Sequence, residues 1–289
     1  MTLSGLLIID KPVGPTSHDV VGRVRRVVGA RRVGHAGTLD PLASGVLLVC
    51  AGRATRLVEY LVGLDKVYET TIRLGQATTT YDAEGEVTAE RPVTATEADI
   101  LASLPAFRGA IRQRVPSYSA VKRDGRPLYE RARRGETIEL PERDVMIHAL
   151  DLMAYEPPLL TLRVACSSGT YIRSLAHDLG ETLGCGGHVV ALRRTAVGRF
   201  TTAQAIAVDD LTPDNVAACL LPLEATIAHL PRVAFDGAAA VELGFGRPVP
   251  APTVSPLGDA AAFGPDGHFL GIVAIEDGLW RPRKMLHQG

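Results

Sequence analysis

The 289-residue sequence has no long apolar run, because its longest uninterrupted hydrophobic stretches, residues 46–51 and 216–221, contain six residues each. A membrane-spanning helix needs about 20 residues, so such a span is excluded. The first ten residues lack the basic segment and the long apolar segment of a secretory signal. The four cysteines form no C-x-x-C pair, which argues against a zinc site and a disulfide framework. Together these absences predict a cytoplasmic protein without a metal site.

The net charge is also close to zero, at −1, so the overall charge predicts no affinity for nucleic acid. The local distribution is different. Nine basic residues face only two acidic ones in the stretch 108–134, and a second basic cluster lies within residues 23–32. Two interpretations stay open: a solvated charged face, or a phosphate-binding surface whose Tyr118 and Tyr129 are available to stack on RNA bases. Proline and glycine within the longer stretch predict a mobile loop leading into a short helix.

Hydrophobic periodicity predicts short strands alternating with amphipathic helices. Ser17 can cap a helix whose valines at 20, 21, 24, 27 and 28 share one face, and Thr96 with Asp99 resembles a capping box. From about Pro231 glycine and proline become dense and short apolar strands replace helices, which predicts a small β-rich module. The predicted strands are 6–9, 46–51, 66–74, 145–155, 159–166 and 189–198, and the other predicted helices are 96–104 and 171–183.

Three segments carry possible chemistry. The glycine-punctuated loop 34–45 contains Asp40 before a proline, which is most often a turn, but the apolar strand that follows would fix this carboxylate as a nucleophile or base. Tyr68 lies in a predicted strand, where tyrosine usually serves packing. Tyr171 and Arg173 begin a predicted helix, and Arg173 is either a surface charge or the partner of a buried carboxylate. No single segment decides between these interpretations.

Together the segments resemble the TruB family of tRNA pseudouridine synthases over nearly the whole chain. The stretch DKPVGPTS from Asp10 is similar to the opening motif of the family. The loop 34–45 resembles the catalytic loop, with Asp40 in the place of the essential aspartate. GTYIR from Gly169 is similar to the motif that places a tyrosine and an arginine beside that aspartate.

Two further segments extend the resemblance. LRR from Leu192 is similar to another active-site segment, and PSYSAVK from Pro116 is similar to the start of an RNA-gripping insertion. The departures are small: Ala36 and Ser44 stand where the family often has threonine, and Ser168 where it often has a basic residue.

The resemblance implies an α+β fold with a central mixed, mainly antiparallel sheet flanked by helices. It implies a catalytic domain over 1–230 with a basic insertion around 108–140, and a small β-barrel-like PUA module over 231–289. The implied reaction isomerises uridine-55 in the T arm of tRNA to pseudouridine, without metal or organic cofactor. The target base is stacked in the T loop and has to flip into a pocket.

The resemblance also assigns site residues. Asp40 is the nucleophile, or the base of a glycal route, Arg173 pairs with it, and Tyr68 stacks on the uracil. The complete set is Asp40, Tyr68 and Arg173 for catalysis; His35, Tyr68, Tyr171 and Leu192 for substrate contact; and Lys122, Arg123 and Arg126 for RNA binding.

Two alternatives belong to other classes. One is a non-catalytic RNA-binding or RNA-folding protein, against which the set of Asp40, Tyr68 and Arg173 argues. The other is the catalytic subunit of a guide-RNA particle. The opening motif begins within ten residues of Met1, which favours the stand-alone bacterial type with tRNA as partner, no membrane and no obligate protein partner.

Overall fold

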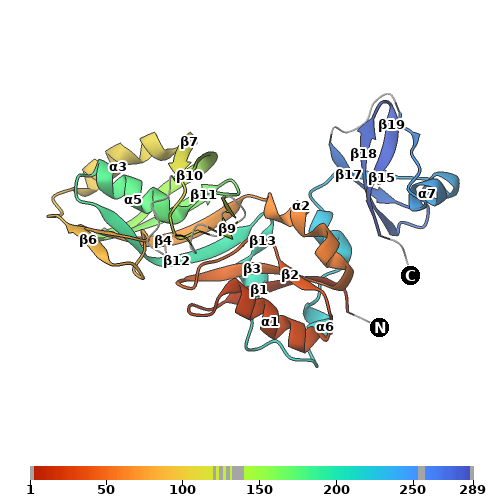
Figure 1. The fold of residues 1–289 in the computed structure, drawn as a ribbon, viewed down its shortest axis with the longest axis horizontal. Helices are drawn as coiled ribbons and strands as arrows, with labels where there is room; N and C mark the ends of the chain where they lie inside the picture. The colour runs from red at the N-terminus through yellow and green to blue at the C-terminus, as the bar shows by residue number, and fades with distance from the viewer. Residues whose placement is uncertain are drawn as a thin grey trace.

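The computed structural model describes residues 3–119, 122–123, 126–127, 131, 140–252 and 258–286. A large sheet with its helices occupies most of the molecule, and a smaller sheet lies at one end (Figure 1). In this part of the chain no helix is long and apolar enough to cross a membrane.

The strands of the large sheet are β1 (Gly5–Lys11), β2 (Val33–His35), β3 (Ala43–Ala51), β4 (Lys66–Leu74), β7 (Gly109–Arg114), β10 (Glu142–Glu156), β11 (Leu159–Cys166), β12 (Gly187–Val197), β13 (Phe200–Thr201) and β14 (Ile206–Ala207). Two small hairpins pair β5 (Gln76–Thr78) with β6 (Val87–Glu90) and β8 (Lys122–Arg123) with β9 (Arg126–Pro127). The α-helices are α1 (Ser17–Val28), α2 (Val58–Val62), α3 (Glu97–Ser103), α5 (Ile172–Thr182), α6 (Val216–Cys219) and α7 (Gly237–Gly244). The 3-10 helices are η1 (Gly52–Leu57), η2 (Leu104–Phe107), η3 (Thr202–Gln204) and η4 (Leu223–Ile227).

The large sheet is mixed and mainly antiparallel, as predicted. Its order is β14-β1-β3-β12-β4-β11-β10-β7, with β2 beside β3 and β13 beside β12. The pairs β1–β14 and β3–β12 are parallel, and the other described pairs of this sheet are antiparallel. Because β12 lies between β3 and β4, segments far apart in the sequence meet at the centre of the sheet.

Strand β3 is buried on both faces, which explains its uninterrupted apolar sequence. Successive side chains of a strand point to opposite faces. Leu47 and Val49 pack in one cluster with side chains of α1 and α5, whereas Leu48 and Cys50 pack in another with side chains of η1, α2 and η4. The predicted helix begins at Ser17, but the prediction that Ser17 caps it is wrong: Thr16 is the cap and forms a capping box with Asp19, while the Ser17 hydroxyl bonds to the Leu39 backbone.

The C-terminal sheet has the order β15-β17-β18-β19-β16. Its strands are β15 (Arg232–Ala234), β16 (Val249–Pro250), β17 (Asp259–Phe263), β18 (Phe269–Glu276) and β19 (Leu279–Met285). One face encloses Trp280 with other apolar residues of the sheet, and the other packs Phe263 and Phe269 against Leu57 of η1 and Ile227 of η4. This sheet therefore docks beside η1 and α2 (Figure 1).

Two further predictions about local structure are wrong, and another, the β-rich tail, is confirmed except that it omits a helix. The loop predicted over 34–45 covers only residues 36–42, because β2 extends to His35 and β3 begins at Ala43. The basic stretch predicted to be a mobile loop begins with strand β7, which pairs with β10 at the edge of the large sheet. The β-rich tail contains a helix, α7, which Asp236 caps by accepting from the Ala239 backbone N–H.

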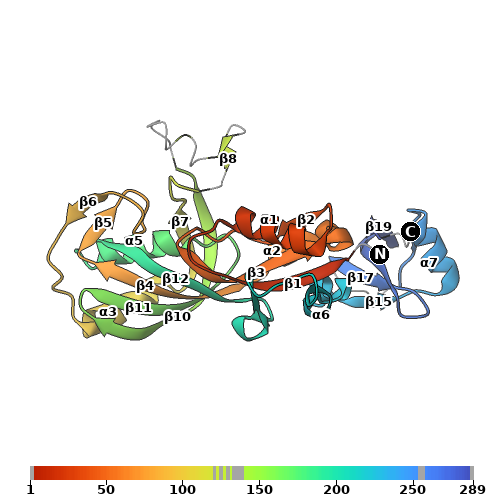
Figure 2. The same ribbon diagram turned by 90° about the horizontal axis from the view of Figure 1, so that it is seen from below.

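The hairpin of β8 and β9 lies within the predicted insertion, and β8 lies away from the large sheet, on the side where α1 is found (Figure 2). Most of the rest of the stretch 120–139 lies outside the described residues.

Candidate active site

A pocket of about 480 Å³ opens between the loop 36–42, β4, β12 and the beginning of α5. This volume is in the usual range for small-molecule sites. The pocket is lined by Gly37, Thr38, Leu39, Asp40, Val62, Lys66, Tyr68, Ser119, Arg143, Ser168, Gly169, Thr170, Tyr171, Ile172, Arg173, Leu192 and Arg194.

The loop 36–42 has no regular secondary structure, so other parts of the chain fix its backbone. The Ser17 hydroxyl accepts from the Leu39 backbone N–H at 2.8 Å and donates to the Leu39 carbonyl at 2.9 Å. The Gly14 N–H donates to the Pro41 carbonyl at 2.9 Å. Both neighbours of Asp40 are thus anchored, which holds its side chain in one place.

Two buried cations hold the ends of this loop through backbone carbonyls. Lys11 is 0% and Arg194 1% exposed. Neither binds a carboxylate directly among the described ion pairs; their charges are satisfied by carbonyl dipoles instead. The Arg194 side chain donates to the carbonyls of Val46 (2.8 Å), Gly37 (3.1 Å) and Thr38 (3.3 Å), and Lys11 Nζ donates to those of Ala43 (2.6 Å) and Pro12 (3.0 Å).

Gly45 permits the close approach of β3 to β12. Its φ is +102°, and a Cβ atom there would lie 2.2 Å from the Arg194 carbonyl oxygen. Any other residue would push the two strands apart, and with them the guanidinium that holds the loop.

Arg173 connects three parts of the chain at the pocket, and its side chain is only 5% exposed. Its Nε lies 3.0 Å from Asp40 Oδ2. Its Nη1 donates to Asp82 Oδ2 and to the Thr80 carbonyl, both at 3.1 Å. Its Nη2 donates to the Tyr118 carbonyl at 2.9 Å, at the start of the insertion. One guanidinium therefore faces two carboxylates.

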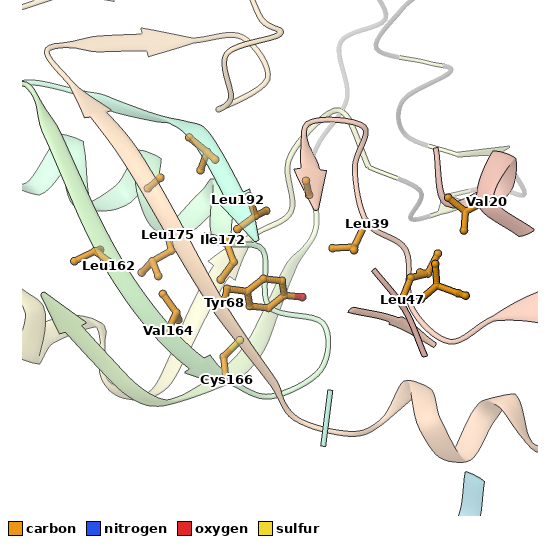
Figure 3. Close-up of a cluster of buried hydrophobic side chains, with 14 of the residues drawn as sticks. Val20, Leu39, Leu47, Tyr68, Leu162, Val164, Cys166, Ile172, Leu175 and Leu192 are labelled. Atoms are coloured by element: carbon orange, nitrogen blue, oxygen red, sulfur yellow. The ribbon is translucent and has the colours of Figure 1, made fainter. Parts of the chain in front are cut away.

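Tyr68 lies on β4 with Leu192 of β12 and Ile172 of α5 close to its ring, and its hydroxyl points towards the side of the pocket where Leu39 lies (Figure 3). The residue is 8% exposed. Burial raises the pKa of its hydroxyl, although nearby Arg194 opposes the shift, so this oxygen is protonated at neutral pH. A flat apolar wall and a hydroxyl thus adjoin the carboxylate.

The pKa of the Asp40 carboxyl is raised above its usual value. The main cause is loss of solvent around it; Arg173 opposes the shift, Asp82 adds to it and Lys11 opposes it. Burial in turn lowers the pKa of Lys11 to about 8. The Asp40 side chain keeps 37% of its surface exposed, so the carboxylate remains open to a molecule that enters the pocket. This arrangement suits a nucleophile or a base.

Family models match most of the chain. The N-terminal domain of TruB family pseudouridylate synthases matches residues 25–172, and the tRNA pseudouridylate synthase B C-terminal domain matches residues 173–228. The chain belongs to the TruB family of pseudouridylate synthases. It is 45% identical to tRNA pseudouridine synthase B of Pseudomonas aeruginosa (strain UCBPP-PA14), over 99% of this chain and 96% of the relative. It is 44% identical to the protein of the same name from Ralstonia pickettii (strain 12J), over 98% of this chain and 94% of the relative.

Solved structures have the same fold as this TruB-family chain. The structure of an H/ACA RNP bound to a substrate RNA containing 2′-deoxyuridine matches with a TM-score of 0.75 at 24% identity, over 98% of this chain and 85% of the other. A crystal structure of a Cbf5-Nop10-Gar1 complex matches with a TM-score of 0.73 at 29% identity, over 93% and 78%. The large mixed sheet with its helices is therefore the pseudouridine synthase fold.

The structure brings most of the predicted TruB site residues together. Asp40, Tyr68, Arg173, Tyr171 and Leu192 all line the pocket. His35 does not line it, because it lies at the end of β2, ahead of the loop. The RNA-binding candidates Lys122, Arg123 and Arg126 form backbone pairs in the hairpin of β8 and β9, and their side chains lie outside the described residues. No group of three metal-ligating side chains occurs in the described part of the chain.

Sequence reasoning missed Asp82, Lys11 and Arg194 in this TruB site. Asp82 belongs to none of the motifs, yet this residue is 3% exposed and bound to Arg173. Its sequence environment, Thr-Thr-Tyr-Asp-Ala-Glu-Gly, has the composition of an ordinary turn. The motifs that contain Lys11 and Arg194 assign no role to these two residues, because lysine and arginine are usually found at the surface.

Proposed function

We propose that this TruB-family enzyme isomerises uridine-55 in the T arm of tRNA to pseudouridine, with Asp40 as the nucleophile or base. The observation that carries the proposal is the 3.0 Å pair of Asp40 and Arg173 in a pocket of nucleoside size. In the reaction the bond from uracil N1 to the ribose breaks and a bond from C5 forms. The proton on C5 is lost and N1 gains one, so the product is an isomer and no cofactor is required.

Some pocket residues hold the base, and others take part in the reaction. Tyr68 stacks on the flipped uracil, and Leu192 packs against it from β12. Tyr171 and Arg143 form the opposite rim, where the Arg143 guanidinium lies 5.2 Å from the centre of the Tyr171 ring. As a cation in the pocket lining, Arg143 would contact a phosphate of the bound nucleotide. Flipping costs a few kcal/mol, which contacts between the protein and the rest of the T arm offset.

The remaining contacts with RNA lie outside the pocket. In the insertion 108–140, the RNA phosphates are bound by Lys122, Arg123 and Arg126. The C-terminal residues 231–289 form a PUA-like RNA-binding module beside the catalytic domain 1–230. His35 directly precedes the loop 36–42, and the role proposed for it is contact with the RNA around the vacated base position. The enzyme acts in the cytoplasm on tRNA and needs no protein partner.

The guide-RNA-particle subunit is the second candidate, because solved structures of such particles share the fold. The stand-alone tRNA enzyme is favoured because relatives named tRNA pseudouridine synthase B are 44–45% identical over nearly the whole chain. A non-catalytic RNA-binding protein has no need of a carboxylate held beside an arginine in a partly buried pocket.

The test compares two conservative substitutions, Asp40→Asn and Asp209→Asn, in the full chain. The rate is measured by tritium release from 5-tritiated uridine in a T-arm stem-loop without guide RNA or partner, and affinity by filter binding. Asp40→Asn removes the negative charge, so it is expected to abolish turnover and leave RNA affinity unchanged or slightly higher. Asp209 is exposed and paired with Arg23, so Asp209→Asn is expected to act like the wild type. Turnover by Asp40→Asn at the wild-type rate would remove the catalytic assignment.

A further inference from the structure

Tyr81 has a backbone conformation that is rare for its type. Its φ is +64°, in the left-handed region that bulky side chains seldom adopt. Both residues beside it bind the same group, because Arg173 Nη1 donates to the Thr80 carbonyl and to Asp82 Oδ2, each at 3.1 Å. The strained residue thus sits between the two acceptors that orient the arginine.

The Tyr81 ring is stacked on His177 of α5. The ring centroids are 4.0 Å apart and the planes differ by 13°. His177 follows Arg173 by four residues, so the two side chains lie on the same face of the helix. The turn therefore contacts one face of α5 at two neighbouring side chains. Thr80 and Asp82 bind Arg173, and Tyr81 stacks on His177.

Hydrogen bonds within the turn hold the Asp82 carboxylate, because Thr80 Oγ1 donates to Asp82 Oδ1 at 2.5 Å and the Glu84 N–H donates to the same oxygen at 3.1 Å. The contacts of the turn with α5 are those to Arg173 and the ring stack on His177. The Val189 N–H donates to the Tyr81 carbonyl at 3.0 Å, and the Ala83 N–H donates to the Val189 carbonyl at 2.9 Å. These two bonds attach the turn to β12, but they do not attach it to α5. His177 Nδ1 is buried and finds no hydrogen-bond partner among the described residues. The contact that His177 makes with the turn is therefore the stacking of its ring on Tyr81.

We propose that Tyr81 and His177 form a positioning pair, whose ring stack fixes the Thr80 carbonyl and the Asp82 carboxylate on Arg173 and so fixes Arg173 on Asp40. The pair touches neither the pocket nor the reacting atoms, so it acts only through the arginine. The proposal rests on the roles of Asp40 and Arg173 given above. Charged groups near the Tyr81 hydroxyl are Asp178, Arg114 and Glu181.

Two substitutions of Tyr81 separate the ring from the backbone. Tyr81→Gly removes the ring but adopts a positive φ without strain. Tyr81→Phe keeps the ring and lacks the hydroxyl. A requirement for the ring stack predicts a slow Tyr81→Gly enzyme and a normal Tyr81→Phe enzyme. His177→Ala is expected to match Tyr81→Gly, whereas His177→Phe keeps a flat ring and is expected to retain most of the rate.

The measurement is the single-turnover rate of tritium release from T-arm RNA at saturating enzyme, with Kd from filter binding. We expect Tyr81→Gly and His177→Ala each to lower the rate about 10-fold with Kd changed less than about twofold. The double variant is expected to be no slower than the slower single, because the two rings act as one unit. Tyr155→Ala is the control, since Tyr155 is bonded to Ala95 away from the pocket. It is expected to lower the melting temperature without lowering the rate.

The pH dependence adds a readout that a purely structural role would not move. Loosening Arg173 weakens its hold on the Asp40 anion, which also faces Asp82 and Lys11. The acid limb of the rate is therefore expected to shift to higher pH in Tyr81→Gly and not in Tyr155→Ala. A wild-type rate and an unmoved acid limb in Tyr81→Gly would overturn the proposal, as would a loss confined to Kd. Absence of turnover in the wild-type protein would instead refute the proposed function.

Discussion

The loop 36–42 and the C-terminal sheet are attached to the large sheet in opposite ways. The loop is held by directional polar bonds from Ser17, Lys11 and Arg194 to its backbone. The C-terminal sheet is attached mainly by apolar packing of Phe263 and Phe269 on Leu57 and its neighbours. A few polar contacts sit around this packing, such as Lys284 with Glu59 at 2.6 Å.

The difference matches what each part has to do. Hydrogen bonds have narrow distance and angle preferences, so a loop fixed by them presents Asp40 in one position. Apolar packing contributes free energy in proportion to buried area but tolerates small shifts. The chain therefore uses polar anchors where geometry decides the rate and apolar ones where only attachment is needed. Four predictions test this contrast.

The largest effect is expected from Arg194→Met. This substitution replaces the guanidinium group by an apolar side chain of similar length and so removes every bond that Arg194 donates to the loop. The loop then loses its bonds at residues 37 and 38, and misplacement of a catalytic group by about 1 Å can cost 100-fold in rate. We expect a loss of about that size in single-turnover rate. The control is Arg193→Met on the same strand, which breaks a half-exposed pair with Asp10 and a 3.4 Å contact with the Ser44 hydroxyl and should cost far less. Equal losses in both variants would contradict the role of Arg194.

Lowering the pH is expected to stop the reaction while the C-terminal sheet stays docked. In the proposed reaction Asp40 acts as the anion. Because its pKa is raised, we expect activity to be lost as pH falls through that raised value, above the range of an ordinary carboxyl. Below it the rate should fall about tenfold per pH unit. The sequence contains one tryptophan, Trp280, buried in the C-terminal sheet. Its fluorescence is expected to stay constant through the loss of activity; a parallel change would show that unfolding, not protonation, stops the reaction.

Removing residues 231–289 is expected to leave a folded and active enzyme that is less stable and binds tRNA more weakly. Truncation uncovers Leu57, which is 0% exposed in the full chain, and burying one leucine side chain contributes about 1.5–3 kcal/mol. Leu57→Ala should therefore cost about 2–5 kcal/mol in the full chain and clearly less in the truncated one. Urea denaturation of the four proteins measures this coupling. Complete loss of turnover in the truncated chain would mean that the module helps to form the pocket.

The smallest effect is expected at the basic residues of the insertion. Replacing Lys122, Arg123 and Arg126 by Gln should reduce the slope of log affinity against log salt by about 2 to 3, as loss of three phosphate contacts requires. Arg112 of β7 already pairs with Glu142 of β10 at 2.8 Å, so Arg112→Gln should change the slope by less than about 1. Filter binding between low and moderate salt gives both slopes. Equal changes per residue would show that β7 binds RNA as strongly as the hairpin.

Much of this architecture could be predicted from the sequence. Strand β4 has the predicted bounds because its burial alternates along its length, and Thr96 with Asp99 forms the predicted capping box. β7 was missed because an edge strand with charged residues on its exposed face does not look apolar. The helix α7 was missed although Asp236 supplies a cap, because the surrounding glycines and prolines dominate the composition.

The site was predictable only where a motif carried it. Asp40 and Arg173 lie in separate motifs, and the sheet order brings them within 3.0 Å. Asp82 lies in a turn that contacts α5, where it binds Arg173. Nothing local in the sequence indicates this contact between two residues so far apart in the chain. Burial of Arg194 likewise depends on Gly45, which belongs to another strand.

The position of β12 has a consequence for synthesis of the protein on the ribosome. A nascent chain emerges from its N-terminus, so β3 and β4 are free long before residues 187–197 appear. Until then no strand joins them, and the group around β4, β11 and β10 forms a sheet separate from β1 and β3. A chain that has not yet reached β12 therefore has no assembled pocket, and it cannot engage a tRNA in the reactive geometry.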